Sequence, residues 1–141
     1  MTTLANTPTA RTHRRRPLVV GTAVLAATVI WLVSQAADVE LKVTLSGQPP
    51  MVIGLPLVVA TALTASLAGW GLLAVLERIS GRARALWTGS ALLALVASFG
   101  PLATAEATGA ARLTLALMHL AVAAVLIPML PRTVAAAGRP S

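Results

Sequence analysis

The amino-acid sequence predicts an all-α membrane protein: an antiparallel four-transmembrane-helix bundle with both termini in the cytoplasm (N-in/C-in). The first observation behind this prediction is composition. The chain has 141 residues, of which 57% are hydrophobic and 11% charged, whereas soluble domains are about half apolar and one quarter charged. The second observation is that the basic residues gather in clusters between paired apolar segments. This arrangement is typical of a multi-pass membrane protein.

The basic clusters predict which side of the membrane each loop occupies. Lys and Arg in short loops are retained on the cytoplasmic side of a bilayer. With four spans, one side of the membrane carries nine basic residues against one acid, and the other carries two basic residues against three acids, in agreement with the net charge of +7. The nine basic residues are Arg11, Arg14, Arg15, Arg16, Arg78, Arg82, Arg84, Arg132 and Arg139.

Composition and motifs also exclude several classes of function. In a soluble protein the high net charge would suggest nucleic acid, but here the basic residues lie at the ends of apolar segments and not along one face, so we expect no nucleic-acid partner. The absence of cysteine removes disulfides and thiol chemistry. The sequence has no paired carboxylates, no serine with a base partner and no glycine-rich phosphate loop, so we expect no enzymatic activity, metal or cofactor.

The N-terminal segment, residues 1–16, is expected to be a disordered basic cytoplasmic tail, because it lacks apolar periodicity and ends in a run of arginines. Arg14, Arg15 and Arg16 are expected to anchor the topology. They are also placed to contact the anionic headgroups of the lipid bilayer, which is the first expected partner.

The four-helix transmembrane domain is expected over residues 17–132, since each apolar stretch is long enough to cross about 30 Å of hydrocarbon. A basic segment before the first stretch, and small residues after it, also describe a cleavable secretory signal, although the apolar run is somewhat long for one. The sequence leaves that alternative open. The expected spans are 18–36, 51–76, 85–105 and 113–130, followed by a short cytoplasmic tail at 133–141.

The segment between the first two spans, residues 37–50, alternates polar and apolar residues with the period of a strand. A lone strand has no ladder partner. It is therefore expected to cap the bundle or to pair with another segment, and pairing with a partner chain stays open. The apolar set is Val39, Leu41, Val43 and Leu45, and the polar set is Asp38, Glu40, Lys42 and Thr44.

Prolines and small residues refine the spans. Pro56 predicts a bend or a late helix start, Pro101 is expected to interrupt the third span, and Pro128 and Pro131 are expected to end the fourth. Trp87 is expected at the cytoplasmic boundary, where an indole suits the interface. Small residues at every fourth position predict close helix contacts on the second and third spans: Thr61, Ala65 and Gly69, and Ser90, Ala94 and Ser98.

Two ionisable side chains come near the hydrocarbon, Glu77 and His119. The helix rise places them about 20 Å apart along the membrane normal, too far for a dyad. We expect His119 to be neutral and to donate a hydrogen bond at its own level, tying the fourth helix to its neighbours. The candidate acceptors are the hydroxyls of Thr28, Thr61 and Ser98 and the carbonyl of Ala97. A ligand or proton site at His119 is the alternative.

Glu77 lies at the end of a helix, where the dipole disfavours an anion. A compensating cation is therefore expected. Arg78 is adjacent but points elsewhere on the helix, so Arg84 or Arg82 across the turn is the expected partner. Such a salt bridge would join the second and third helices.

Four strings of residues resemble a family of small four-helix actinobacterial membrane proteins that is a domain of unknown function. The resemblance extends over about residues 17–132. It implies a four-span membrane protein and brings no activity or substrate. The strings are GWGLLAVLER (69–78), ARALWT (83–88), SFGPL (98–102) and LALMHLAVAAVLIPML (115–130), and within them Glu77, Arg78, Pro101, His119 and Pro128 belong to the family pattern.

Together these observations predict a multi-pass protein of the plasma membrane that is not an enzyme and acts through lipid or protein contacts. A membrane protein partner or a homo-oligomer is compatible with this prediction. The alternative is a small transporter or channel subunit with a polar site near His119, which would need a hydrated cavity reaching that level.

Overall fold

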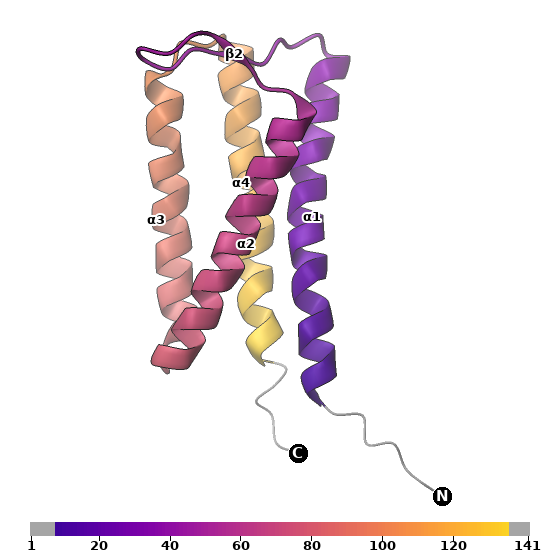
Figure 1. Cartoon of the computed structure of the whole chain (residues 1–141), viewed down its shortest axis with the longest axis vertical. Helices are drawn as coiled ribbons and strands as arrows, with labels where there is room; N and C mark the ends of the chain where they lie inside the picture. The colour runs from indigo at the N-terminus through magenta and orange to yellow at the C-terminus, as the bar shows by residue number, and fades with distance from the viewer. Residues whose placement is uncertain (1–7, 136–141) are drawn as a thin grey trace, which may run out of the picture.

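The computed structural model describes the backbone of residues 8–135 and the side chains of residues 15–132. This part of the chain forms four long helices and one two-stranded hairpin (Figure 1). All four helices are long and apolar enough to cross a membrane. In chain order the elements are α1 (Pro8–Ala36), β1 (Lys42–Val43), β2 (Met51–Val52), α2 (Leu55–Ile79), α3 (Ala83–Thr104) and α4 (Gly109–Ala135).

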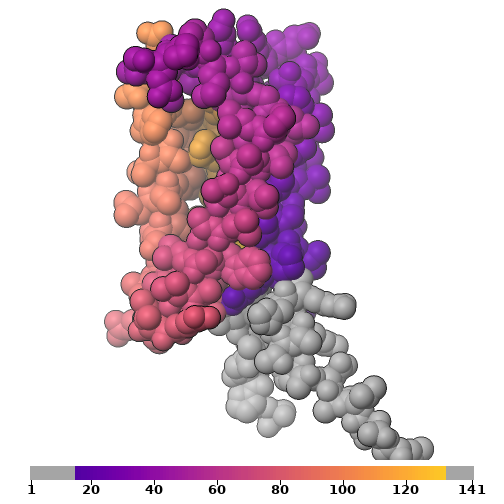
Figure 2. Space-filling model, in the orientation of Figure 1, coloured from indigo at the N-terminus to yellow at the C-terminus, as the bar shows by residue number. Residues whose placement is uncertain are grey.

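The four helices run up and down in sequence order. Helix α1 packs against α2 and α4, and helix α3 also packs against α2 and α4, so α1 and α3 occupy opposite corners. Figure 1 shows α2 crossing the bundle diagonally, from α1 near the hairpin to α3 at the other end. In Figure 2 the surface is hollowed between α2 and α3 on the hairpin side, and α4 is visible behind the hollow.

The bundle has two chemically different ends. The hairpin end consists of residues 37–54 and the α3–α4 connection, residues 105–108. The arginine end is formed by the first part of α1, the α2–α3 turn and the last part of α4. Its described arginines are Arg15, Arg16, Arg78, Arg82, Arg84 and Arg132.

Helix α1 begins earlier than expected. It starts at Pro8 and continues through Pro17, so residues 8–16 are helical, and the expectation of a disordered tail is wrong for them. Residues 1–7 lie outside the described part of the chain. The helix can cross Pro17 because a proline removes a single backbone hydrogen bond, and the arginines before it and Leu18 after it have high helix propensity.

Helices α3 and α4 also continue through their prolines. Pro101 lies inside α3, and Pro128 and Pro131 lie inside α4, which ends at Ala135. The expected interruption of the third span and the expected stop of the fourth are therefore wrong. Apolar packed helices tolerate proline because neighbouring groups and small local adjustments satisfy the freed carbonyls.

The helix of the second span starts later than residue 51, as the position of Pro56 predicted. Met51 and Val52 form β2, and α2 begins at Leu55 with Pro56 in its first turn. A first-turn proline has no intrahelical N–H bond to lose. The late helix start is confirmed, and the assignment of residues 51–54 to the span is wrong.

Residues 37–54 and 105–108 form a small lid on the hairpin end, with the alternating segment after α1 at its centre. The pairing partners of this segment lie within the chain. Lys42 and Val43 pair antiparallel with Val52 and Met51. On the other edge, Thr44 exchanges two backbone hydrogen bonds of 2.9 Å with Glu106. Residues 42–44 therefore use both edges internally.

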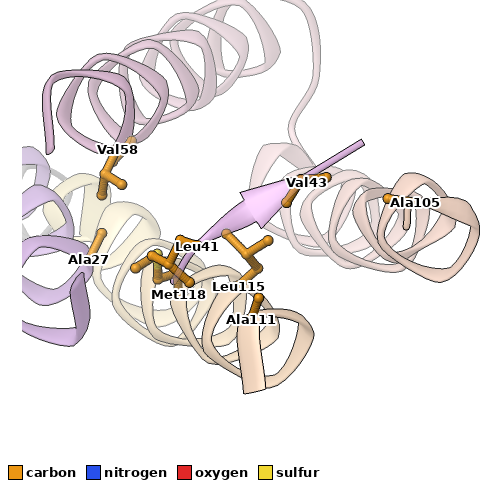
Figure 3. Close-up of a cluster of buried hydrophobic side chains, with 9 residues drawn as sticks. Ala27, Leu41, Val43, Val58, Ala105, Ala111, Leu115 and Met118 are labelled. Atoms are coloured by element: carbon orange, nitrogen blue, oxygen red, sulfur yellow. The ribbon is translucent and has the colours of Figure 1, made fainter. Parts of the chain in front are cut away.

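The lid is seated on the helices by its apolar face. Leu41 and Val43 are 1% and 7% exposed, whereas Lys42 between them points to the surface. Figure 3 shows Leu41 lying over Leu115 and Met118 of α4, and Val43 directed toward Ala105. The period-two pattern of the sequence is confirmed as a buried and an exposed face.

A left-handed residue connects α1 to the lid. Asp38 has φ 52°. Its N–H donates to the carbonyl of Gln35, and the N–H of Val39 donates to that of Ser34. These two bonds form a Schellman motif, in which glycine is the usual left-handed residue.

The inward face of α2 differs from the predicted stripe by one position. Thr61 and Ala65 are exposed and only Gly69 is half-buried. One residue corresponds to about 100° of rotation, so a neighbouring stripe faces the bundle. On α3, Ser90 and Ser98 are half-buried and Ala94 is exposed. The buried residues of α2 are Val58, Ala62, Ser66 and Leu73.

Candidate functional site

A salt bridge crosses the arginine end of the bundle. The Nη2 atom of Arg16 lies 2.8 Å from Oε1 and 3.0 Å from Oε2 of Glu77, with the two side chains 13% and 23% exposed. The pair joins α1 to α2, so the expected partners Arg84 and Arg82 are wrong. Arg16 reaches Glu77 because α1 is already helical before Pro17, which places Arg16 on the helix face toward α2.

Beside this pair lies a cavity of about 360 Å³ between the α2–α3 turn and the end of α4. Its apolar wall consists of Leu73, which is 1% exposed, and the buried Pro131. Its polar wall is formed by Glu77, Ser80 and Arg84. The cavity therefore offers both charge and apolar surface to one ligand.

Arg84 contributes the unpaired charge of this cavity. Within residues 15–132, the ion pair of Arg16 and Glu77 is the one salt bridge formed. Arg84 is exposed, and so are Arg78 and Arg82 on the same end. The sequence-predicted residues Glu77 and Arg84 thus line one cavity, and Arg78 lies on the surface outside its lining.

Ser80 ends α2 and has a defined role in the turn. Its hydroxyl oxygen accepts a 3.1 Å hydrogen bond from the backbone N–H of Arg82. A serine hydroxyl has one hydrogen to donate in addition to its acceptor sites. The bond from Arg82 therefore orients Ser80 while leaving its O–H able to donate toward the cavity.

Trp87 lies in the second turn of α3, at the arginine end where it was expected, and is buried in the core there. Its side chain is 3% exposed and packs with Leu73 and Leu126. A Cβ added to Gly69 would lie 2.8 Å from the ring atom Cη2, so Gly69 makes room for the indole. Within the described residues the Nε1 atom of Trp87 has no hydrogen-bond partner.

His119 does not make the interhelical hydrogen bond that was expected. Its Nδ1 lies 2.7 Å from the carbonyl oxygen of Leu115 in the same helix, and its ring contacts Phe99 of α3 with 6.2 Å between centroids. In the neutral side chain Nδ1 carries the donated hydrogen, which leaves Nε2 as an acceptor. His119 connects α4 to α3 by ring packing and not by a polar bond.

The other predicted polar residues are likewise bonded within their own helices. Thr61 donates to the carbonyls of Leu57 and Val58, at 2.8 and 3.1 Å, and Ser98 donates to that of Leu95 at 2.6 Å. Hydroxyls in helices commonly bond to the preceding turn. The structure therefore does not bring Thr61, Ser98 and His119 together through hydrogen bonds.

Several polar contacts at the hairpin end were not predicted. The Nε1 atom of Trp31 donates to the carbonyl of Ile53 at 3.1 Å, and Nη2 of Arg112 donates to that of Ala105 at 2.8 Å. The position of Trp31 near the end of an apolar span was a usable signal, because boundary indoles need an acceptor. The two bonds hold the lid to α1 and α4.

The described part of the chain has no cluster of metal-ligating side chains. Among these residues, no three His, Cys, Asp or Glu side chains are grouped so that they hold a metal ion. Glu77 and His119 belong to different ends: Glu77 shares its cavity with Leu73, whereas the neighbour of His119, Met118, packs under the lid.

Comparison with known proteins places the chain in a family. No curated protein and no solved structure matches it. A family model described as a family of unknown function (DUF6069) matches residues 7–136. The match extends somewhat beyond the expected residues 17–132 at both ends. Because it covers nearly the whole chain, the protein belongs to the family of unknown function DUF6069.

Proposed function

We propose that this protein is a non-enzymatic, multi-pass protein of the plasma membrane, with both termini in the cytoplasm, whose arginine end contacts lipid or another protein. The observation that carries the proposal is the difference in charge between the two ends of the bundle. In the described side chains the arginine end has six arginines against Glu77. The hairpin end, with the first turn of α4 included, has three acids, Asp38, Glu40 and Glu106, against Lys42 and Arg112.

The orientation follows from this asymmetry. We take the four helices, which are long and apolar enough, as membrane spans, so that every loop belongs to one of two surfaces, and basic loops are generally retained in the cytoplasm. The arginine end is therefore assigned to the cytoplasmic surface. Exposed arginines there are attracted to the anionic lipids of that leaflet, each by about 1 kcal/mol.

The hydrogen bonds of the membrane-level polar residues favour an interaction role over the alternative, a small transporter or channel subunit. The side chains of His119, Thr61 and Ser98 are each bonded to a carbonyl of their own helix. A transport or catalytic site needs polar groups that converge on one point between helices. By contrast, the polar groups of the arginine end do converge, on one cavity.

The orientation is tested by single-cysteine labelling, for which the cysteine-free chain needs no background mutations. Ser46→Cys lies in the hairpin loop and Gly81→Cys in the α2–α3 turn, and both positions are exposed. In intact spheroplasts a membrane-impermeant maleimide should label Ser46→Cys alone, and permeabilisation should expose Gly81→Cys. The reverse pattern would overturn the proposed orientation.

The interaction role is tested by photo-crosslinking in native membranes. A photoreactive residue is placed at position 81 or, as the matched control, at position 46. Lipid or protein adducts should concentrate at position 81. Equal adducts at both positions would contradict a specialised arginine end, and substrate uptake that depends on His119 would favour the transporter alternative.

A further inference from the structure

The cavity at the arginine end has a charge balance suited to an anion. Among the described residues of its wall Glu77 is the one acid, and both carboxylate oxygens of Glu77 lie within 3.0 Å of Nη2 of Arg16. The negative charge of the wall is therefore compensated from α1. What remains is the positive charge of Arg84, which has no salt bridge within residues 15–132.

We propose that this cavity binds the headgroup of one anionic phospholipid. The inference deepens the proposed function, on which it rests, by naming the class of ligand at the arginine end. The phosphate lies against the guanidinium of Arg84, and the acyl chains leave the cavity along the apolar surface of the neighbouring helices. A guanidinium presents paired N–H donors that match two phosphate oxygens.

Ser80 supplies a second donor on the same wall. Its oxygen is engaged as acceptor by the backbone N–H of Arg82 at 3.1 Å. The hydroxyl hydrogen is thereby directed away from that N–H, and donation to a phosphate oxygen completes the bonding of the hydroxyl. Arg84 and Ser80 line the cavity together with Ala83, which has only a methyl group, and Gly81, which has no side chain, so neither residue fills the space beside the two donors.

The size and position of the cavity favour a lipid over a soluble anion. Its volume of about 360 Å³ lies in the range of small-molecule sites, about 300–1,000 Å³. Leu73 and Pro131 are the buried part of its lining, and the cavity lies at the end of helices that are apolar enough to cross a membrane. An amphiphile bound there keeps its charge at the boundary and its acyl chains beside the apolar helices, whereas a free phosphate or glycerol phosphate uses only the polar donors.

The test is native mass spectrometry of the detergent-released, full-length protein with added phosphatidylglycerol. One lipid should bind per chain, with at least fivefold preference over phosphatidylcholine. Arg84→Gln should weaken that binding about five- to tenfold, as expected for losing one charged hydrogen-bonding group. Ala83→Met, which fills the cavity without changing charge, should weaken it to a similar extent.

Matched controls separate a site from a general charge effect. Arg82→Gln removes the same charge from the same turn but outside the cavity lining, and Ala85→Met adds the same volume on the outer face of α3. Both should change phosphatidylglycerol binding less than twofold. Equal losses for Arg84→Gln and Arg82→Gln would overturn the site and leave a diffuse basic surface.

The source of the phosphate is tested by a competing soluble ligand. Millimolar sn-glycerol 3-phosphate should not displace the lipid, and its displacement of the lipid would overturn the lipid assignment. Thermal unfolding of each variant shows whether it is folded. If Arg84→Gln unfolds early, it is replaced by Arg84→Lys, which keeps the charge and loses the paired donors. Because the measurement is made in detergent, it is independent of orientation, so failure of the site and failure of the proposed topology are distinguishable.

Discussion

The two ends of the bundle are closed by different kinds of interaction. At the hairpin end, backbone hydrogen bonds join three segments, and Leu41 and Val43 are buried beneath them. At the arginine end, one partly buried side-chain pair, Arg16 with Glu77, stands beside an open cavity. Backbone pairing specifies a single geometry, whereas side chains around a cavity can rearrange around a ligand. The difference shows structural closure at the hairpin end and supports the recognition role proposed for the arginine end.

The largest effect is expected from the lid. Leu41→Ala should destabilise the protein by about 2–5 kcal/mol, because it removes a fully buried side chain from the cluster over α4. Lys42→Ala, at the exposed neighbouring position, should change stability little. Thermal unfolding in detergent, followed by tryptophan fluorescence, measures both. Similar midpoints for the two variants would break the comparison, because they would mean that the lid is not anchored by its apolar face.

The next effect is expected at Gly69. Gly69→Ala should cost about 1–3 kcal/mol, because the added Cβ lies 2.8 Å from the Trp87 ring and the ring has no flexible end to move. Gly71→Ala is the control: it meets no atom within 4 Å and should be neutral or stabilising, since alanine favours the helix. Trp87→Phe, which shortens the ring, should restore part of the stability of Gly69→Ala. A Gly69→Ala variant as stable as Gly71→Ala would show that the indole is not held against α2.

The salt bridge should have a smaller effect, measurable by a double-mutant cycle. Arg16→Gln combined with Glu77→Gln should give a coupling energy of about 1 kcal/mol, which is at the upper end for partly exposed pairs. The reason is that both carboxylate oxygens of Glu77 accept from Nη2 of Arg16. The same cycle with Arg15→Gln, an exposed arginine one position earlier, should give coupling near zero. Chemical unfolding at two salt concentrations measures the coupling energy. Equal coupling energies for Arg15 and Arg16 would mean that Glu77 is attracted to the basic surface in general and forms no specific pair with Arg16.

The smallest effect is expected at the left-handed residue before the lid. Asp38→Gly should stabilise the protein by up to about 1 kcal/mol, because glycine adopts φ 52° without steric cost. Glu40→Gly loses the same charge from an ordinary backbone position and should be slightly destabilising. Thermal midpoints again compare the two, and a destabilised Asp38→Gly would indicate that the aspartate side chain itself holds the α1 end.

The length of the apolar segments was enough to predict the four helices, and the alternation of polar and apolar residues was enough to predict the two faces of the lid segment. The burial of Leu41 and Val43 could be predicted because the alternation of side chains along an extended segment depends only on local geometry. The helix ends at Pro17 and Pro131 were placed wrongly, since a proline disfavours a helix locally but packing of the whole helix can outweigh it.

The candidate site was predicted in part. Glu77 and Arg84 were singled out and do share a cavity, but the partner Arg16 is 61 positions from Glu77 in the chain and was not predicted. That pairing depends on how α1 and α2 cross, which no local pattern contains. The expected bond between His119 and a neighbouring helix failed for a related reason. A carbonyl of the same helix is always within reach, and it was the nearer acceptor.

The bridge between Thr44 and Glu106 links the loop after α1 to the loop after α3. The α2–α3 turn, residues 80–82, joins the N-terminal helix pair, α1 and α2, to the C-terminal pair, α3 and α4, through the covalent chain at the arginine end. The N-terminal pair and the C-terminal pair are therefore held to each other at both ends of the bundle, by backbone hydrogen bonds at one end and by the chain itself at the other. Loss of the Thr44–Glu106 bridge would leave the turn as the one backbone link between the two pairs within the described residues.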